Sequence, residues 1–176
     1  AGDRLGNVAG ARRFDHALEM GRVDKETDKT KWEMLPHQIN AYYHPNLNEI
    51  VFPAAILQPP FFDAEADDAT NLGAMGVVVG HEMTHGFDDQ GRQYDASGNL
   101  RDWWTADDAA EYEKRVQVMV DQAETFEVEG KPLNGRLTCG ENIADLGGLA
   151  LAFAALEASG AKDAARVNGF TAQQRF

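Results

Sequence analysis

The sequence has few of the features that membrane-spanning, nucleic-acid-binding and disulfide-linked proteins require. No run of 18 or more apolar residues occurs among its 176 residues, so the sequence predicts no membrane-spanning segment. Basic residues are scarce, and the net charge of −13 argues against a nucleic-acid partner. A single cysteine, Cys139, cannot form a disulfide within the chain. What remains is an acidic stretch about one domain long, in which 43% hydrophobic residues suffice for a core.

A His-Glu-x-x-His motif at residues 81–85 is the most informative stretch. It ends an apolar run from Leu72 to Val79, which predicts a largely buried helix. Residues four apart share one face of a helix, so His81 and His85 can both turn a ring nitrogen toward one zinc ion. Glu82 lies about 100° further round the helix and points at a water on the metal rather than at the metal. The pattern is typical of a hydrolytic zinc site.

Two histidines leave one protein ligand to be found. One class of zinc peptidase has a third His six residues after the second, but Gly91 stands at that position. The better candidate is Glu141, at the start of a second helical pattern that runs to about Ser159. A His-His-Glu set leaves a fourth position open for water. Asp145, one turn after Glu141, is placed to accept the outer N–H of a ligand histidine and to fix its tautomer.

Other side chains near the motif have alternative interpretations. Asp88 and Asp89 follow the second histidine closely, so they could orient it or could be rival metal ligands. Cys139 stands two residues before Glu141. Because His-His-Glu already fills the three protein positions of a catalytic zinc, we interpret Cys139 as a small buried residue at the entry to the helix.

Four motifs follow one another along the chain: Asn40 to Tyr43, Ile50 to Phe62, His81 to Asp89, and Gly140 to Gly148. In sequence and in order they resemble the neprilysin family of zinc metallopeptidases, which includes the endothelin-converting enzymes and the bacterial oligopeptidase PepO. The resemblance is continuous from about Trp32 to Gly148. It implies a fold similar in plan to the helical lobe of thermolysin, which also uses two His and one Glu.

The resemblance also implies substrate contacts. Asn40 and Ala41 match the pair that binds the substrate backbone in this family, although Asn40 could merely begin a strand. Four apolar residues match the lining of the hydrophobic pocket that receives the residue after the cleaved bond, and each could equally be ordinary core: Ile56, Phe61, Val77 and Val78.

The remaining patterns predict a mostly helical α+β fold with a small β-hairpin or edge strand. Helices are expected from about Asn7 to Met20, from Thr105 to about Phe126, and through the two metal-binding segments, the first capped by Thr70 or Asn71. Strands are expected at Ile39 to Tyr43 and Glu49 to Phe52. The segment from Ala150 to Leu156 is apolar nearly all round, which predicts a buried helix.

The function expected is that of a zinc-dependent endopeptidase acting on short peptides, with one Zn²⁺ per chain. The zinc-bound water would be the nucleophile and Glu82 the general base. A non-catalytic peptide-binding protein or a structural zinc protein is the alternative. Structural zinc sites are usually closed and rich in cysteine, however, and a protein without catalysis would have no need of Glu82.

Residues 1–176 are expected to be part of a metallopeptidase catalytic domain, truncated at both ends. The chain begins without Met or a signal pattern, and the helix-capping pattern at Thr171 to Gln174 comes too close to the end for a helix to form. The downstream His and Arg that the family uses would follow Phe176, so this piece is expected to hold zinc with weak or no activity. Its low cysteine content resembles that of bacterial members, in the cytoplasm, the periplasm or secreted.

Overall fold

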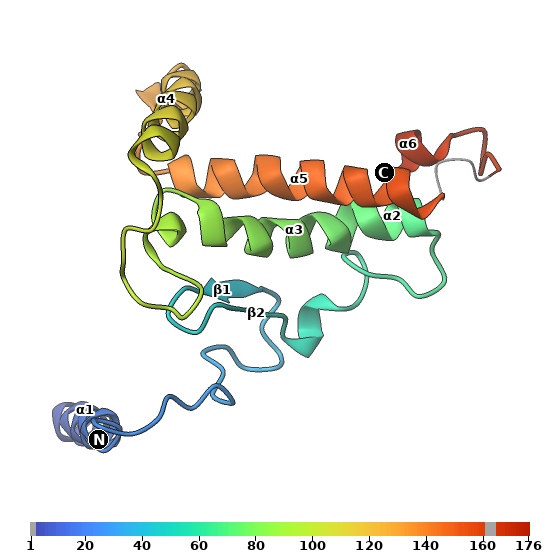
Figure 1. Ribbon diagram of the computed structural model, residues 1–176. Helices are drawn as coiled ribbons and strands as arrows, with labels where there is room; N and C mark the ends of the chain where they lie inside the picture. The colour runs from blue at the N-terminus through green and yellow to red at the C-terminus, as the bar shows by residue number, and fades with distance from the viewer. Residues whose placement is uncertain (1–2, 161–164) are drawn as a thin grey trace. The chain divides into compact units, whose positions relative to one another are not determined.

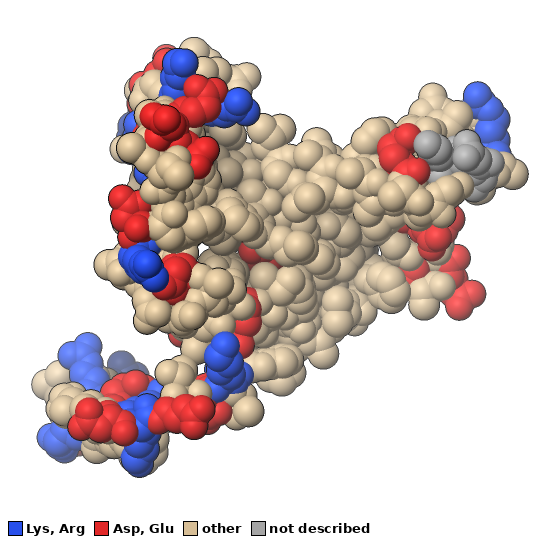
Figure 2. Space-filling model, in the orientation of Figure 1, with Lys and Arg blue, Asp and Glu red and all other residues tan. Residues whose placement is uncertain are grey.

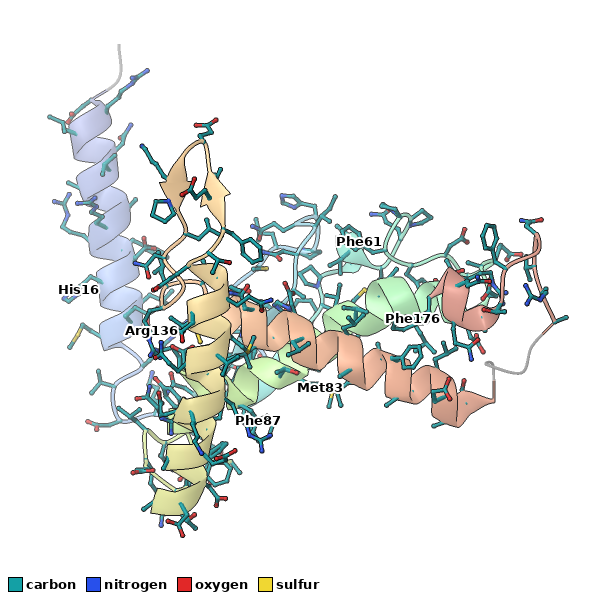
Figure 3. All side chains as sticks on the ribbon, turned by 90° about the horizontal axis from the view of Figure 1, so that it is seen from above. His16, Phe61, Met83, Phe87, Arg136 and Phe176 are labelled. Carbon is teal, nitrogen blue, oxygen red and sulfur yellow. The ribbon has the colours of Figure 1, made fainter. Side chains whose placement is uncertain are left out.

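The computed structural model describes residues 3–160 and 165–176, in two compact units, Ala1–Glu33 and Met34–Phe176. The described part of the first unit, residues 3–33, contains one helix, α1 (Arg4–Met20), and none of the residues of α1 is buried. It begins earlier than the pattern predicts because the Asp3 side chain accepts a hydrogen bond from the backbone N–H of Gly6 and caps the helix. His16 projects from the exposed surface of α1 (Figure 3).

The second unit is built on two antiparallel helices that lie side by side, α3 (Val77–Thr84) and α5 (Cys139–Ser159) (Figure 1). α3 continues α2 (Asp68–Asn71) and a π-helical segment, η2 (Leu72–Gly76), so that residues 68–84 form one helical run. The prediction of a cap at Thr70 or Asn71 was wrong. Asp67 caps the run instead, because its carboxylate accepts hydrogen bonds from the backbone N–H groups of the first turn.

A β-hairpin packs against α3, formed by β1 (Tyr42–His44) and β2 (Glu49–Val51) in antiparallel register with Tyr43 opposite Ile50. It is shorter than predicted, and Ile39 to Ala41 precede the strand. Continuing the pairing would set Pro53 in the ladder, where it has no N–H to donate. Pro53 begins the short 3₁₀ turn η1 (Ala54–Ile56) instead.

The helix α4 (Ala106–Ala123) begins at Thr105, whose hydroxyl accepts from the Asp108 N–H, as the sequence predicts. It ends before the predicted Phe126 because a second hairpin follows, β3 (Glu127–Val128) with β4 (Lys131–Pro132). The inner face of α4 packs on the start of α5, where Cys139 is fully buried beside Val116 and Val120. Cys139 therefore occupies the core position expected of it.

A short helix, α6 (Ala172–Arg175), packs against α2 near the other end of α5 (Figure 1). The capping box at Thr171 is present, but the expectation that no helix could follow it was wrong, because one turn suffices to bury Ala172 against Ala69 and Leu156. Phe176 stacks edge-on against Phe153 of α5, and Figure 3 shows it beside that helix. These contacts hold the start of the α2–α3 run against α5.

The prediction that Ala150 to Leu156 is buried on all sides was also wrong. Ala152 and Leu156 are buried, but Leu151 and Phe153 are exposed, because α5 meets α3 along one face only. Figure 2 shows a broad uncharged surface over α3 and α5. By length and composition alone α5 could cross a membrane, a property shared with the core helices of many soluble proteins. The mostly helical α+β class itself is confirmed.

Candidate metal centre

The two histidines of the motif come together at the end of α3. His81 is in its last turn, and His85 follows α3 as the first residue of η3 (His85–Phe87). Their Nε2 atoms are 2.9 Å apart, and the ring planes stand at 87° to each other. The helical spacing of four residues is the cause, since it places both rings on one face.

The third side chain comes from α5. Glu141 lies in the first turn of α5, and its Oε2 is 3.3 Å from Nε2 of His81 and 3.6 Å from Nε2 of His85. One donor atom from each of these residues lies within 4.8 Å of the others. Because α3 and α5 are antiparallel, the end of α3 meets the beginning of α5. The structure therefore brings together the three residues that the sequence predicts as ligands.

A carboxylate holds the outer nitrogen of each histidine. Nδ1 of His81 is 2.8 Å from Oδ1 of Asp145, and Nδ1 of His85 is 2.6 Å from Oδ2 of Asp88. An Nδ1–H that donates to a carboxylate leaves the Nε2 of the same neutral ring with a free lone pair. With the proton on Nδ1 in both rings, both Nε2 atoms face Glu141 as electron-pair donors. The geometry favours the orienting role of Asp88 over the role of a rival ligand.

This donor set fits zinc. Two bare Nε2 atoms and a carboxylate oxygen repel one another unless a cation lies among them. In tetrahedral zinc coordination with bonds near 2.0–2.1 Å, ligand atoms lie roughly 3.3 Å apart. The three separations of 2.9, 3.3 and 3.6 Å scatter around that value. Three protein ligands would leave a fourth position open, as catalytic zinc sites do.

Asp88 is itself held firmly in a turn. Its second oxygen, Oδ1, accepts hydrogen bonds from the backbone N–H groups of Gln90 and Gly91 at 2.9 and 2.6 Å, where the 3₁₀ turn η4 (Gly91–Gln93) begins. Burial alone would raise the pKa of Asp88, but the hydrogen bonds from His85, Gly91 and Gln90 outweigh it and lower the pKa. The same hydrogen bond between the two side chains raises the pKa of His85, against its burial. Asp88 is therefore a charged acceptor at neutral pH.

Glu82 stands beside the three ligand atoms without joining them. It lies on the cavity wall together with β1 residues Tyr42 and Tyr43, and only 6% of the residue is exposed. Burial raises the pKa of Glu82, and the charges of His85 and His81 together with a hydrogen bond from the backbone N–H of Tyr43 offset part of that rise. A carboxyl group with a raised pKa next to a metal site is suited to taking up and returning a proton.

A cavity of about 570 Å³ opens over these side chains. Asn40 and Ala41, predicted to bind substrate, lie on its wall together with Glu82 and Glu141. The complete lining consists of Asn40, Ala41, Tyr42, Tyr43, Pro45, His81, Glu82, His85, Asp88, Gln90, Gly91, Tyr94 and Glu141.

The four residues predicted to line an apolar pocket are absent from this wall. Ile56 is buried in the core, and Val77, Val78 and Phe61 are half-buried. Their role in a pocket stays a prediction. Sequence reasoning missed Tyr94, which lines the cavity from the position directly after η4, where its backbone pairs with Leu100 and no motif marks it.

The family model and the curated relatives that match this chain indicate the same family. A model of peptidase family M13 matches residues 40–176. Endothelin-converting enzyme 1 of Rattus norvegicus is 47% identical over 167 residues, which cover 93% of this chain and 22% of that protein. Neprilysin-3 of Drosophila melanogaster is 48% identical over 136 residues, or 77% of this chain and 17% of that protein. This chain thus spans about a fifth of the length of the curated relatives that it matches.

Solved structures agree in fold. The zinc metalloprotease Zmp1 of Mycobacterium tuberculosis, in complex with an inhibitor, superposes with a TM-score of 0.86 at 46% identity, covering 92% of this chain and 26% of that one. PepO from Lactobacillus rhamnosis gives a TM-score of 0.73 at 37% identity, covering 86% of this chain and 24% of that one.

Proposed function

The chain belongs to peptidase family M13, and from that premise we propose that it is part of a zinc-dependent endopeptidase that hydrolyses short peptides. One observation carries the proposal. Three side chains from two helices, His81, His85 and Glu141, present their donor atoms to a common point, while a carboxylate holds the outer nitrogen of each histidine.

A zinc ion held by these residues would supply a Lewis acid that polarises the peptide carbonyl and lowers the pKa of bound water toward roughly 7. The protein's own part is proton transfer and positioning. Glu82 takes the proton of the attacking water at its carboxylate and delivers it to the nitrogen of the leaving amine. The backbone N–H of Tyr43 in β1 lowers the pKa of Glu82 and so favours the ionised carboxylate that takes up the proton.

Substrate binding would use the segment just before β1. Asn40 and Ala41 stand on the cavity wall, where the side-chain amide of Asn40 can hydrogen-bond the backbone of an extended peptide. Ile56, Phe61, Val77 and Val78 would favour an apolar residue after the cleaved bond, as the family resemblance implies. By this proposal, residues 1–176 on their own bind zinc and hydrolyse peptides weakly or not at all.

The decisive experiment is Glu82→Gln in the full-length protein, with zinc content and hydrolysis of a quenched fluorescent peptide measured on the same sample. We expect zinc to be retained at one per chain and kcat to fall by at least about 10²-fold, since general acid–base catalysis contributes that much. Glu111→Gln on the exposed face of α4 makes the same chemical change away from the site and is the matched control.

The alternative is a structural zinc protein or a non-catalytic peptide-binding protein. Such a protein would tolerate Glu82→Gln without consequence, because its function would not require a buried carboxylate beside the ligands. Hydrolysis at the wild-type rate in Glu82→Gln would defeat the mechanism, and the absence of hydrolysis in the wild-type full-length protein would favour the alternative.

A further inference from the structure

We propose that Gly148 of α5, which faces Gly80 of α3, sets the separation of the two helices and thereby the geometry of the metal site. The inference rests on the proposed function, since it concerns the same three ligands. It assigns a positioning role to residues that carry no side chain and touch no ligand atom.

The two helices approach more closely here than any side chain would allow. A Cβ placed on Gly148 would lie 2.6 Å from the carbonyl oxygen of Val77 and 2.7 Å from the backbone nitrogen of His81. A Cβ on Gly80 would lie 2.8 Å from the carbonyl oxygen of Gly148. Real Cβ atoms essentially never come within 3.0 Å of such atoms. Because the obstacles are backbone atoms, only a shift of one whole helix could relieve the overlap.

The close contact and the metal ligands belong to one continuous interface. Glu141, Asp145 and Gly148 follow one another at helical spacing on the face of α5 that meets α3. On α3 the atoms that Gly148 approaches are the backbone nitrogen and Cα of His81, a ligand residue itself. A displacement at Gly148 therefore moves His81 directly, and it moves Glu141 and Asp145 through the rigid turns of α5.

The size of the displacement decides the outcome. Bringing a Cβ of Gly148 out to an ordinary contact distance of 3.4 Å from the Val77 carbonyl oxygen requires the backbones to separate by about 0.8 Å. Metal–ligand distances tolerate about ±0.2 Å. The hydrogen bond from Nδ1 of His81 to Asp145, 2.8 Å long, also spans the two helices and would lengthen with the same movement. A methyl group at Gly148 is therefore expected to weaken zinc binding even where both helices stay folded.

Gly147 offers an independent test, because a second substitution is expected to reverse part of the effect of the first. A Cβ at this position would overlap Oγ1 and Cγ2 of Thr84, which are side-chain atoms and can be removed. Gly147→Ala is expected to weaken zinc binding, and adding Thr84→Ala to it should restore part of the affinity. The rescue is partial because the Cβ of Thr84 remains 2.9 Å away. A role in overall stability alone gives no reason for metal affinity to recover in this way.

The experiment compares variants of the full-length protein in zinc affinity and coordination. The dissociation constant is measured by competition with a chromophoric chelator, and the visible spectrum of the cobalt-substituted protein reports the coordination geometry. We expect Gly148→Ala to weaken binding on the order of tenfold or more, as loss of ligand-orienting contacts does. Gly76→Ala is the matched control, since the atoms nearest to its Cβ would be side-chain atoms, of Leu72 at 3.2 Å and of Ala152 at 3.7 Å. It should bind zinc within about twofold of wild type.

The outcomes separate this inference from the proposed function. If the wild-type protein fails to bind one zinc, or if His81→Ala binds it as tightly as wild type, the proposed metal site is wrong. If wild type binds zinc and Gly148→Ala matches it in both affinity and cobalt spectrum, the positioning role is refuted. Should Gly148→Ala not fold, the Gly147 pair decides: no recovery of zinc affinity on adding Thr84→Ala overturns the inference.

Discussion

Asp88→Asn tests whether a carboxylate is needed to keep His85 in the tautomer that can bind a metal through Nε2. The two oxygens of Asp88 have separate partners. Oδ2 accepts from Nδ1 of His85, and Oδ1 accepts from the backbone N–H groups of Gln90 and Gly91. Asparagine has the same shape but only one oxygen, so one side of its amide must present N–H to a donor.

The asparagine amide is expected to turn its oxygen toward the loop, because the backbone N–H groups of Gln90 and Gly91 both lie there. On the other side lies a single donor, Nδ1 of His85. His85 then faces an NH₂ group, and its Nδ1 becomes the acceptor. The ring proton moves to Nε2 and blocks the lone pair that a metal needs. The substitution should weaken zinc binding by 10- to 100-fold, or about 1.4–2.7 kcal/mol.

Asp145→Asn is the informative comparison. The Asp145 side chain is 74% exposed and accepts one hydrogen bond from His81, whereas the Asp88 side chain is 9% exposed. The asparagine oxygen can rotate to face His81 while its NH₂ group is solvated. Because exposed pairs contribute roughly 0–1 kcal/mol, the affinity for zinc should change by less than about fivefold.

Zinc dissociation constants of the two variants, measured by chelator competition at pH 7.5, decide the matter. Equal, small losses for both substitutions would refute the tautomer argument, because it requires the buried carboxylate to matter more than the exposed one. A larger loss for Asp145→Asn would contradict it as well.

Two further predictions concern stability. Burial raises the pKa of Asp67, but hydrogen bonds from Arg175 and Thr70 and the charge of Arg175 outweigh burial, so the pKa in the folded protein is lowered. The resulting stabilisation is present above the unfolded pKa of about 3.9 and is lost as the pH falls through the folded pKa. Asp67→Asn keeps a capping side chain, so Tm between pH 6 and 2 should fall less steeply than in wild type, and parallel curves would contradict this. Leu156→Ala, at a fully buried position against Ala69 and Ala172, should lower the free energy of unfolding in urea by about 2–5 kcal/mol. The exposed Leu149→Ala on the same helix should change it by less than about 0.5 kcal/mol, and equal losses would argue against the core assigned here.

Several boundaries of helices and strands were predicted wrongly because a residue outside the predicted stretch decided where the element begins or ends. Thr70 and Asn71 are good capping residues, but Asp67 comes first in the chain and already satisfies the free N–H groups of the helix start. The pattern of Ile39 to Tyr43 favours a strand, yet pairing depends on a partner, and the partner strand stops before Pro53. In both cases the residue that decided the boundary lay outside the stretch that carried the pattern.

The apolar segment of α5 was misjudged for a different reason. Apolar residues on all sides indicate that a helix can be buried, but burial also needs neighbours on all sides. Within the residues described, α5 has α3 along one face and leaves Leu151 and Phe153 exposed. The sequence of a helix determines which faces can be covered, and only the rest of the structure determines which ones are.

The sequence alone determined the parts of the site that depend on one helix. His81 and His85 share a face because they are four residues apart, and the same holds for Glu141 and Asp145; this follows from the helical repeat. Only the tertiary structure decided that α3 and α5 run antiparallel in the register that sets His81 against Asp145 and brings Glu141 to both histidines. In that register the backbones of Gly80 and Gly148 meet, a close approach between residues far apart in the chain that no local periodicity encodes.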